Sequence, residues 1–438
     1  MALKDTPDSE LVAAFARAVA AAGGRALEAG GAVRDRLLGR PARDTDLEVY
    51  GLDAAALEAV VGRFGPVRRV GARLGVYVLK GMEIALPQAP GGVEDPRLSP
   101  EAASRRRDLT VNALLRDPLT GDILDFHGGR ADLAAGRLRL VDAATFAEDP
   151  LRVLRVVRLH AELAFAVDPA TAAVCRGLDP TAAAWERVGG EVERWLLAAP
   201  HPGKGLDALV YTGAERRFPH LARLLDCPAP GADDAWALTR AALEEAAAER
   251  CGERGRDWPL MLAALLAAAG RPDVTRRVAG GLRAPAHAAA AAARVPLFLH
   301  GVDRSADRKR TVAALVRAQE AVAGLAAAGA ELPAYRRLAR CVDSDLLLRL
   351  SRALHRAEHG GEAAFPAGER ARTIWEREDL LGKAPEPILQ GRDLAQLGIE
   401  PGPGMGEWLE AAFEAQLDGA FSDREGGLAW LRQRLPTG

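Results

Sequence analysis

Cysteine is scarce in this sequence, and so are long apolar runs. The four cysteines among 438 residues have neither the paired spacing of a zinc site nor the density of a disulfide scaffold: Cys175, Cys227, Cys251 and Cys341. We expect them to be reduced and structural. No unbroken apolar run reaches membrane-spanning length, and no positively charged start precedes an apolar signal core. We therefore expect a soluble, cytoplasmic protein with no membrane partner.

An excess of positive charge is also missing. Lys and Arg number 58 against 60 Asp and Glu, which gives a formal charge of −2. Proteins that bind nucleic acid usually do so through clustered Lys and Arg, and such clusters occur here locally. Arg105, Arg106 and Arg107 are adjacent, and Arg152, Arg155 and Arg158 recur at helical spacing. The overall charge therefore does not decide the question of a nucleic-acid partner.

The length predicts two to four domains. An amphipathic helix is expected over residues 8–22 and another helix over 54–64, with strand-like runs between and after them: 46–50, 75–80, 82–86, 122–125 and 137–141. From Pro150 onward the segments are rich in Ala, Leu and Arg at helical spacing. The predicted fold class is α+β, with a head containing a small mixed or antiparallel sheet, followed by an all-α neck, body and tail. Breaks rich in Pro and Gly suggest these boundaries: 1–145, 146–222, 223–358 and 359–438.

An acidic pair occurs where the first of these strands begins. Asp44 and Asp46 are two residues apart, so they share a face if the strand continues through Tyr50. Two carboxylates on one side suit Mg²⁺, and Glu83, on the predicted strand 82–86, is the natural third carboxylate. Two metal ions bound there could activate an attacking hydroxyl group and stabilise a leaving pyrophosphate. An isolated Asp-x-Asp is more often a solvated turn, so the surrounding motifs decide between these interpretations.

A glycine-rich turn lies just upstream of the acidic pair. Gly30 and Gly31 precede Arg34 and Asp35 at the start of a predicted helix over 32–38. Glycines let backbone N–H groups approach a triphosphate, a helix N-terminus adds partial positive charge, and an Arg pairs with phosphate. The alternative is an ordinary tight turn followed by a solvated helix face.

The segment GGAVRDRLLGRPARDTDLE, residues 30–48, resembles the signature of the nucleotidyltransferase head in class II tRNA nucleotidyltransferases, the CCA-adding enzymes and bacterial poly(A) polymerases. The resemblance implies metal binding by Asp44 and Asp46 and triphosphate contact by Gly30, Gly31 and Arg34. It further implies Mg²⁺ as cofactor, CTP and ATP as substrates, and addition of C, then A, to the 3′ end of tRNA.

Two downstream motifs are similar to further blocks of this family. Residues 106–113 resemble the Arg-Arg-Asp-Phe-Thr-x-Asn-Ala block, which implies nucleotide contact by Arg106, Arg107, Asp108 and Asn112. Residues 148–155 resemble the Glu-Asp-x-x-Arg block, which implies base selection by Asp149 and Arg152, supported by Arg155. On a helix, residues three apart project together, so Asp149 and Arg152 could match one base edge. The alternative is that Asp149 caps a helix whose first residue is Pro150.

The remaining resemblance is looser but covers nearly the whole chain. Residues 125–136 resemble a third block with a hinge Asp, for which Asp132 as a helix cap and Gly136 as a helix end are the alternatives. Segments 185–191, 204–221, 390–398 and 401–419 resemble the family's helical neck and tRNA-gripping tail.

The sequence departs from the family pattern in two places. Many relatives carry a metal-dependent phosphohydrolase module marked by His-Asp, but Ala267 and Ala268 stand at the matching positions. Since Ala cannot bind metal, we expect the body to be a degenerate scaffold without hydrolase activity. The interval from Glu83 to Arg106 is short, with Pro87 where an Arg often follows. A short loop resembles the CC-adding subgroup, which would imply a separate A-adding enzyme. The alternative is a stiffer, Pro-rich loop that does the same job. The residues are also compatible with a poly(A) polymerase or with a catalytically silent RNA-binding scaffold.

Overall fold

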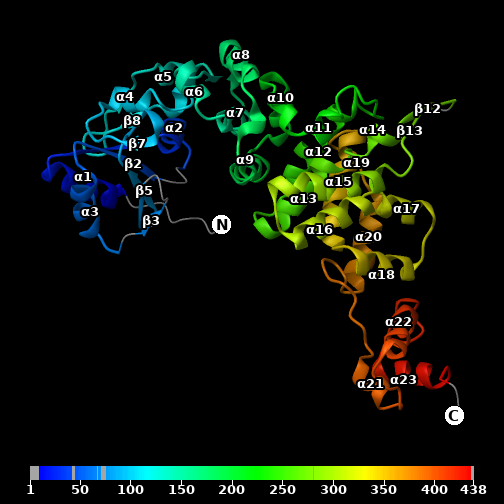
Figure 1. The fold of residues 1–438 in the computed structure, drawn as a ribbon. Coiled ribbons are helices and arrows are strands. Elements are labelled where there is room, and N and C mark those ends of the chain that lie inside the picture. Colours follow the sequence, from blue (N-terminus) through cyan, green and yellow to red (C-terminus); the bar gives the residue numbers. More distant parts are fainter. Residues whose placement is uncertain (1–8, 42–44, 67, 71–74, 280, 436–438) are drawn as a thin grey trace. The chain divides into compact units, whose positions relative to one another are not determined.

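The structure is a computed structural model that describes residues 9–41, 45–66, 68–70, 75–279 and 281–435. The chain divides into two compact units, Met1–Arg217 and Phe218–Gly438 (Figure 1). No helix in the described parts combines the length and the apolar character needed to cross a membrane.

The first unit begins with an α/β region and continues into helices. Its strands are β1 (Arg25–Ala29), β2 (Thr45–Tyr50), β3 (Arg68–Val70), β4 (Val76–Leu79), β5 (Met82–Ala85), β6 (Gln88–Ala89), β7 (Val93–Glu94), β8 (Leu115–Arg116), β9 (Ile123–Leu124), β10 (Arg137–Leu138) and β11 (Ala166–Val167). Its helices are α1 (Ser9–Ala21), α2 (Gly31–Leu37), α3 (Ala54–Gly62), α4 (Pro100–Ser104), α5 (Gly129–Ala134), α6 (Ala143–Ala147), α7 (Leu151–Leu163), α8 (Pro169–Gly177), α9 (Trp185–Ala198) and α10 (Pro202–Thr212). Short 3₁₀ turns are η1 (Pro90–Gly92), η2 (Thr110–Asn112), η3 (Pro180–Ala182) and η4 (Ala214–Arg217).

A seven-stranded mixed sheet forms the centre of the described α/β region, in the order β3-β4-β5-β2-β1-β8-β9. β2 pairs antiparallel with β1 and parallel with β5. Side chains of β2 alternate, so that Leu47 and Val49 are buried while Asp46 and Glu48 are half-buried. This period of two assigns one face of the sheet to the core and the other to polar residues.

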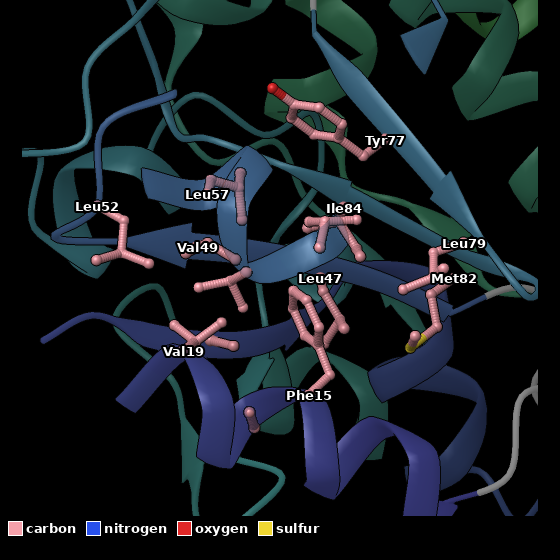
Figure 2. Packing of buried hydrophobic residues seen from close by; sticks show 14 of the residues in the cluster. Phe15, Val19, Leu47, Val49, Leu52, Leu57, Tyr77, Leu79, Met82 and Ile84 are labelled. Atoms are coloured by element: carbon pink, nitrogen blue, oxygen red, sulfur yellow. The ribbon is translucent and has the colours of Figure 1, made fainter. Parts of the chain in front are cut away.

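The core of the head lies between that apolar face and two helices. Apolar residues of α1 recur at i, i+3, i+4 and i+7, and this stripe packs against the sheet: Val12, Phe15, Ala16 and Val19. Figure 2 shows Phe15 and Val19 pointing toward Leu47 and Val49 of β2. α3 adds Leu57 and is capped by Asp53, whose carboxylate accepts the Ala56 N–H at 2.8 Å. Burial of this face holds β2 and β5 side by side with their polar residues on the opposite side.

The second unit is mostly helical. Its helices are α11 (Pro219–Ala222), α12 (Ala235–Ala248), α13 (Arg254–Leu266), α14 (Arg271–Val274), α15 (His287–Val302), α16 (Ala306–Ala318), α17 (Ala321–Ala327), α18 (Leu332–Cys341), α19 (Ser344–His359), α20 (Pro366–Arg377), α21 (Gly391–Ala395), α22 (Pro403–Leu417) and α23 (Arg424–Arg432). Its strands are β12 (Arg276–Val278) and β13 (Gly281–Arg283). Every residue of α13 from Asp257 to Leu266 is buried, which makes α13 the central helix.

The predicted α+β class is confirmed, with two local departures from an all-α second half. β11 follows α7 and pairs in parallel with β10 of the head. β12 and β13 form an antiparallel hairpin between α14 and α15. Strands this short carry too few alternating residues to be distinguished from turns in the sequence. The division into four domains remains a prediction.

Candidate functional site

The polar face of the sheet brings two of the predicted carboxylates together. Asp46 of β2 is directly opposite Glu83 of β5 in the parallel register. Residues in register on neighbouring strands project from the same face. Asp44 lies outside the described residues, so its expected place on this face stays a prediction. No group of three or more His, Cys, Asp and Glu side chains placed to hold a metal is found among the described residues.

A cleft of about 320 Å³ opens over these carboxylates. Its polar lining consists of three acids from the sheet, one amide and three arginines: Asp46, Glu48, Glu83, Gln88, Arg106, Arg107 and Arg152. Carboxylates on one wall and guanidinium groups on another make a site suited to metal ions and phosphates together. Five residues predicted from the sequence therefore meet here.

Glu48 is a cleft residue that the sequence interpretation missed. Its carboxylate accepts a hydrogen bond from Tyr50 Oη at 2.7 Å and one from Arg107 Nη2 at 3.3 Å. Burial alone would lower the pKa of Arg107, but Glu48, Tyr50 and Asp46 raise it. Burial and the Glu48 charge raise the pKa of Tyr50. Since Glu48 lies two residues after Asp46, extending the alternation of the strand would have found it.

The glycine turn meets this charged group directly. Gly30 has φ 73° and ψ −136°, and Gly31 is the first residue of α2. A Cβ atom on Gly30 would lie 3.1 Å from Arg107 Nη1 and 3.7 Å from Asp46 Oδ2. A side chain here would force Arg107 to shift by a few tenths of an ångström, and the positive φ of Gly30 is one that residues with a Cβ rarely adopt. Triphosphate contact by Gly30 and Gly31 stays a prediction.

Four predicted nucleotide-binding residues form a buried chain of polar contacts. Arg34 Nη1 donates to Asn112 Oδ1 at 2.8 Å, and Asn112 Nδ2 donates to Asp108 Oδ1 at 3.2 Å. Arg155 Nε lies 2.9 Å from Asp108 Oδ2. Asp35 completes the chain by accepting from Arg34 Nε at 2.8 Å. None of the five is among the residues that line the described cleft, so their direct nucleotide contact stays a prediction.

The charge state of this chain follows from its surroundings. Asp108 is 4% exposed, and burial alone would raise its pKa. The Arg155 charge, the Asn112 amide and the Leu109 N–H instead lower the pKa of Asp108 below its usual value. The carboxylate is therefore ionised, and it fixes both the Asn112 amide and the Arg155 guanidinium. The chain thereby connects α2, the segment 108–112 and α7.

Arg106 and Arg152 hold the edge of the cleft. Arg152 donates from Nη1 to the Thr145 carbonyl at 2.7 Å and from Nη2 to the Arg106 carbonyl at 2.6 Å. Burial lowers the pKa of Arg152. Arg106 Nη2 donates to Glu148 Oε2 at 2.5 Å. These contacts connect the segment after α4 to α6 and α7, so the arginines of two sequence blocks become one wall.

Asp149 takes a partner that the sequence interpretation did not include. Its carboxylate accepts from Arg187 of α9 at 3.1 and 2.6 Å, a bidentate pair. α7 begins at Leu151, so Asp149 precedes the helix, and its Oδ1 accepts the Leu151 N–H at 3.1 Å. Asp149 therefore lies just before the helix and Arg152 within it, and their joint selection of a base stays a prediction. Burial would raise the pKa of Asp149, but Arg187 and the Leu151 N–H lower it.

Asp132 of the third block is fully buried and ionised. It accepts from Thr110 Oγ1 at 2.7 Å, Arg137 Nε at 2.7 Å and Arg139 Nε at 2.9 Å. Burial would raise the pKa of Asp132, and these donors lower it. The helix α5 begins after Gly128, so Asp132 is not its cap. The interpretation of Asp132 as a cap is wrong, because the side chain points to other segments.

Comparison with known proteins agrees with this geometry. Residues 90–139 match the family described as the poly A polymerase head domain. The multifunctional CCA proteins of Xanthomonas campestris pv. campestris and Leptothrix cholodnii are 38% and 40% identical over 221 and 219 residues. Those matches include 45% and 47% of this chain and 52% and 51% of the relatives, so the chain spans about half the length of the curated relatives it matches. The crystal structure of the Bacillus stearothermophilus CCA-adding enzyme in complex with CTP is 25% identical, with a TM-score of 0.69 over 97% of both chains.

The chain is therefore similar to CCA-adding enzymes both in sequence and in fold. The Thermotoga maritima CCA-adding enzyme complexed with tRNA shares the fold at 18% identity, with a TM-score of 0.62 over 97% of this chain and 95% of that one. The family fold thus extends through the second unit, beyond the region matched in sequence.

In this chain, the positions that match the expected His-Asp pair are part of a core. Ala267 and Ala268 are 4% and 5% exposed and follow the buried helix α13. Gln319 Nε2 donates to the Ala267 carbonyl at 3.1 Å. Methyl groups here contribute packing and no metal ligand.

The segment between the two halves of the site is compact. β6 and β7 form a two-stranded hairpin around η1, and the Asp95 N–H donates to the Pro87 carbonyl at 2.8 Å. Glu94 Oε1 accepts the Gly75 N–H at 2.9 Å. The short interval after Glu83 is therefore an ordered turn at the cleft.

Proposed function

We propose that the chain is a Mg²⁺-dependent nucleotidyltransferase that adds C and A from CTP and ATP to the 3′ end of tRNA, without a nucleic-acid template. The observation that carries the proposal is the register of Asp46 opposite Glu83 in a cleft that three arginines share. It is supported by the fold match to a CCA-adding enzyme that binds CTP. A cytoplasmic location accompanies this proposal.

The acidic wall fits a divalent cation by the chemistry of its donors. Carboxylate oxygens are the ligands that Mg²⁺ prefers, and Asp44, Asp46 and Glu83 would hold it. Bound Mg²⁺ would lower the pKa of the attacking 3′-hydroxyl and offset charge on the leaving pyrophosphate.

The cationic wall fits the nucleotide. Arg106 and Arg107 present guanidinium donors to phosphate oxygens, which they bind in a forked geometry. The backbone at Gly30 and Gly31 approaches the same space at the N-terminus of α2. Glu48 holds Arg107 in place at 3.3 Å, so Arg107 is positioned before substrate arrives.

Base selection would fall to Arg152 and Asp149, at the junction of head and helices. Arg152 lines the cleft, while Asp149 is oriented by Arg187. The network of Arg34, Asn112, Asp108 and Arg155 does not line the cleft, and it would act by positioning α2 and α7. A good bidentate contact discriminates against a wrong base by roughly 1–3 kcal/mol, by analogy with groove readout.

The test is incorporation of labelled CTP and ATP into tRNA transcripts that end before CCA, after C and after CC. We expect Asp44→Ala, Asp46→Ala and Glu83→Ala each to reduce incorporation by on the order of 100-fold or more. Glu58→Gln, which removes an exposed carboxylate from α3, is the matched control and should retain activity. Unchanged incorporation by Asp46→Ala would refute the catalytic assignment and favour an RNA-binding scaffold.

A CC-adding enzyme is the second candidate, and the compact β6–β7 turn after Glu83 favours it. Such an enzyme would add two C and no A in the same assay, and a separate A-adding enzyme would complete the end. Extension with ATP alone on an unrelated RNA would instead identify a poly(A) polymerase.

A further inference from the structure

The second unit carries a basic hairpin that the proposed chemistry does not use. β12 and β13 form this ribbon between α14 and α15, and in Figure 1 it extends outward from the helices of its unit. Arg276, Arg277 and Arg283 are exposed on it. Among the described residues, no ion pair engages any of these three guanidinium groups, although most other arginines of the unit are paired.

The register of the hairpin places two positive charges side by side. Arg276 is directly opposite Arg283 across the antiparallel pair. Cross-strand neighbours on one face lie about 4.5–5.5 Å apart at Cβ, and like charges there destabilise the pair. An isolated two-stranded ribbon is marginally stable even without this repulsion. The arrangement therefore opposes folding, and an anionic partner would offset it.

The carboxylate of the helix before the hairpin is already occupied. Asp273 of α14 accepts from Arg223 Nη2 at 2.7 Å and from Arg294 Nε at 3.0 Å. Those hydrogen bonds lower the pKa of Asp273, so it carries its full charge but shares it between two arginines. A hollow of about 320 Å³ adjoins the hairpin, and Arg223, Arg276 and Arg277 are among the residues that line it. The surface is locally cationic on a chain whose net charge is −2.

We propose that Arg276, Arg277 and Arg283, on strands β12 and β13, bind the phosphodiester backbone of a structured RNA. Arginines on a ribbon match phosphate oxygens in forked geometry, and such contacts position an RNA without reading its sequence. An acidic protein surface is a poorer fit, because stable protein interfaces are anchored by buried aromatic or apolar residues. The largest exposed apolar side chain of the two strands is Val278, at 39%. That this RNA is the tRNA substrate rests on the proposed function.

The experiment uses the full chain and a tRNA transcript that lacks CCA, with no nucleotide present. Binding is measured by fluorescence anisotropy between roughly 50 and 200 mM salt for wild type and for Arg276→Gln/Arg283→Gln. Each lost phosphate contact reduces the slope of log K against log salt by about 1, so we expect the slope to fall by about 2. We expect Kd at about 100 mM salt to rise roughly tenfold.

A matched variant removes the same charge elsewhere. Arg304→Gln/Arg317→Gln replaces two exposed arginines on the helical part of the same unit, and it should retain the wild-type slope. The hairpin variant should melt at or slightly above the wild-type temperature, since a repulsion is removed. If the hairpin variant binds the RNA more weakly but melts no earlier than wild type, the weaker binding reflects a lost contact and not misfolding.

Three outcomes would overturn the inference. They are an unchanged slope and Kd in the hairpin variant, an equal loss in the control variant, and an equal loss of binding to polyglutamate, which would indicate a general polyanion surface. The result is independent of catalysis: if wild type binds RNA through the hairpin but incorporates neither CTP nor ATP, the proposed function fails and the RNA contact stands.

Discussion

Replacing Gly30 with alanine tests whether the glycine turn serves the site or only the fold. The backbone at Gly30, with φ 73° and ψ −136°, lies in a region that residues with a Cβ rarely occupy. Strain of this kind costs about 1–3 kcal/mol. The added Cβ would also lie 3.1 Å from Arg107 Nη1, which is too close, so Arg107 must shift by a few tenths of an ångström. Arg107 is held by Glu48, so the shift disturbs the charged wall of the cleft.

The same helix offers the control. Gly39, just after α2, also has a positive φ of 67°, but a Cβ there meets nothing within 4 Å. Gly39→Ala should cost about 1–2 kcal/mol of stability through left-handed backbone alone. One kcal/mol corresponds to about 2–4 °C in Tm for a unit of this size. Both variants should therefore melt earlier, while only Gly30→Ala should lose nucleotide incorporation, by roughly tenfold or more in kcat/KM.

The assay compares Tm by calorimetry with steady-state incorporation of CTP at a temperature where both variants are folded. If Gly30→Ala and Gly39→Ala lose activity equally, the loss reflects destabilisation and the proposed role of Gly30 at the site is wrong. Wild-type kcat/KM in a folded Gly30→Ala protein would refute the contact with Arg107 as the reason for glycine.

Three further predictions concern the core, the proposed base selection near Asp149, and pH. Phe15→Ala removes a fully buried ring from the head core and should cost about 3–5 kcal/mol in denaturant unfolding, whereas Glu10→Ala on the exposed side of α1 should cost less than about 1 kcal/mol. Arg187→Ala should reduce discrimination between CTP and UTP, and Arg187→Lys should restore it only in part, because Lys cannot form the bidentate pair with Asp149. Arg194→Ala, on the same helix, is the control and should retain discrimination. Equal selectivity in all three variants would contradict the role of Arg187. Burial is the largest cause that lowers the pKa of four histidines below 6.5: His127, His160, His220 and His287. Because the unfolded chain then binds more protons than the folded one, stability should fall as pH drops through about 6.5 toward about 5. His160→Gln should flatten this fall in Tm, whereas His300→Gln, at an exposed position, should not. A Tm independent of pH over this range would contradict the prediction.

Alternation and helical periodicity were enough to predict much of the head. The run 46–50 appears as β2, 82–86 as β5 and 54–64 as α3, each within two residues at its ends. These segments combine a clear period with burial on one side, so local pattern and tertiary structure agree. The pairing of Asp46 with Glu83 could be anticipated because both lie on strands, although the register itself depends on packing.

Other parts of the site depend on contacts between distant segments. Asp149 pairs with Arg187, which is 38 residues away, and Asn112 pairs with Arg34 at a separation of 78. A single sequence gives no signal for such partners, because each residue alone is compatible with a solvated position. α7 begins at Leu151, so Asp149 lies before the helix and Arg152 within it. Pro150 is compatible with this helix start, but the motif alone does not determine where either side chain points.

The site has two layers with different physical roles, and single sequence motifs contribute residues to both layers. The outer layer, with Asp46, Glu83 and Arg106, keeps half-buried charges facing a cleft where metal and phosphate would neutralise them. The inner layer, with Asp108 and Asn112, is nearly dry, and its charges are satisfied by fixed partners. Removing the partner of a buried charge costs far more free energy than removing the partner of an exposed charge. The inner contacts are therefore fixed, and they hold the outer residues in place. A motif that spans both layers would therefore combine residues proposed to act on substrate with residues that hold them in position.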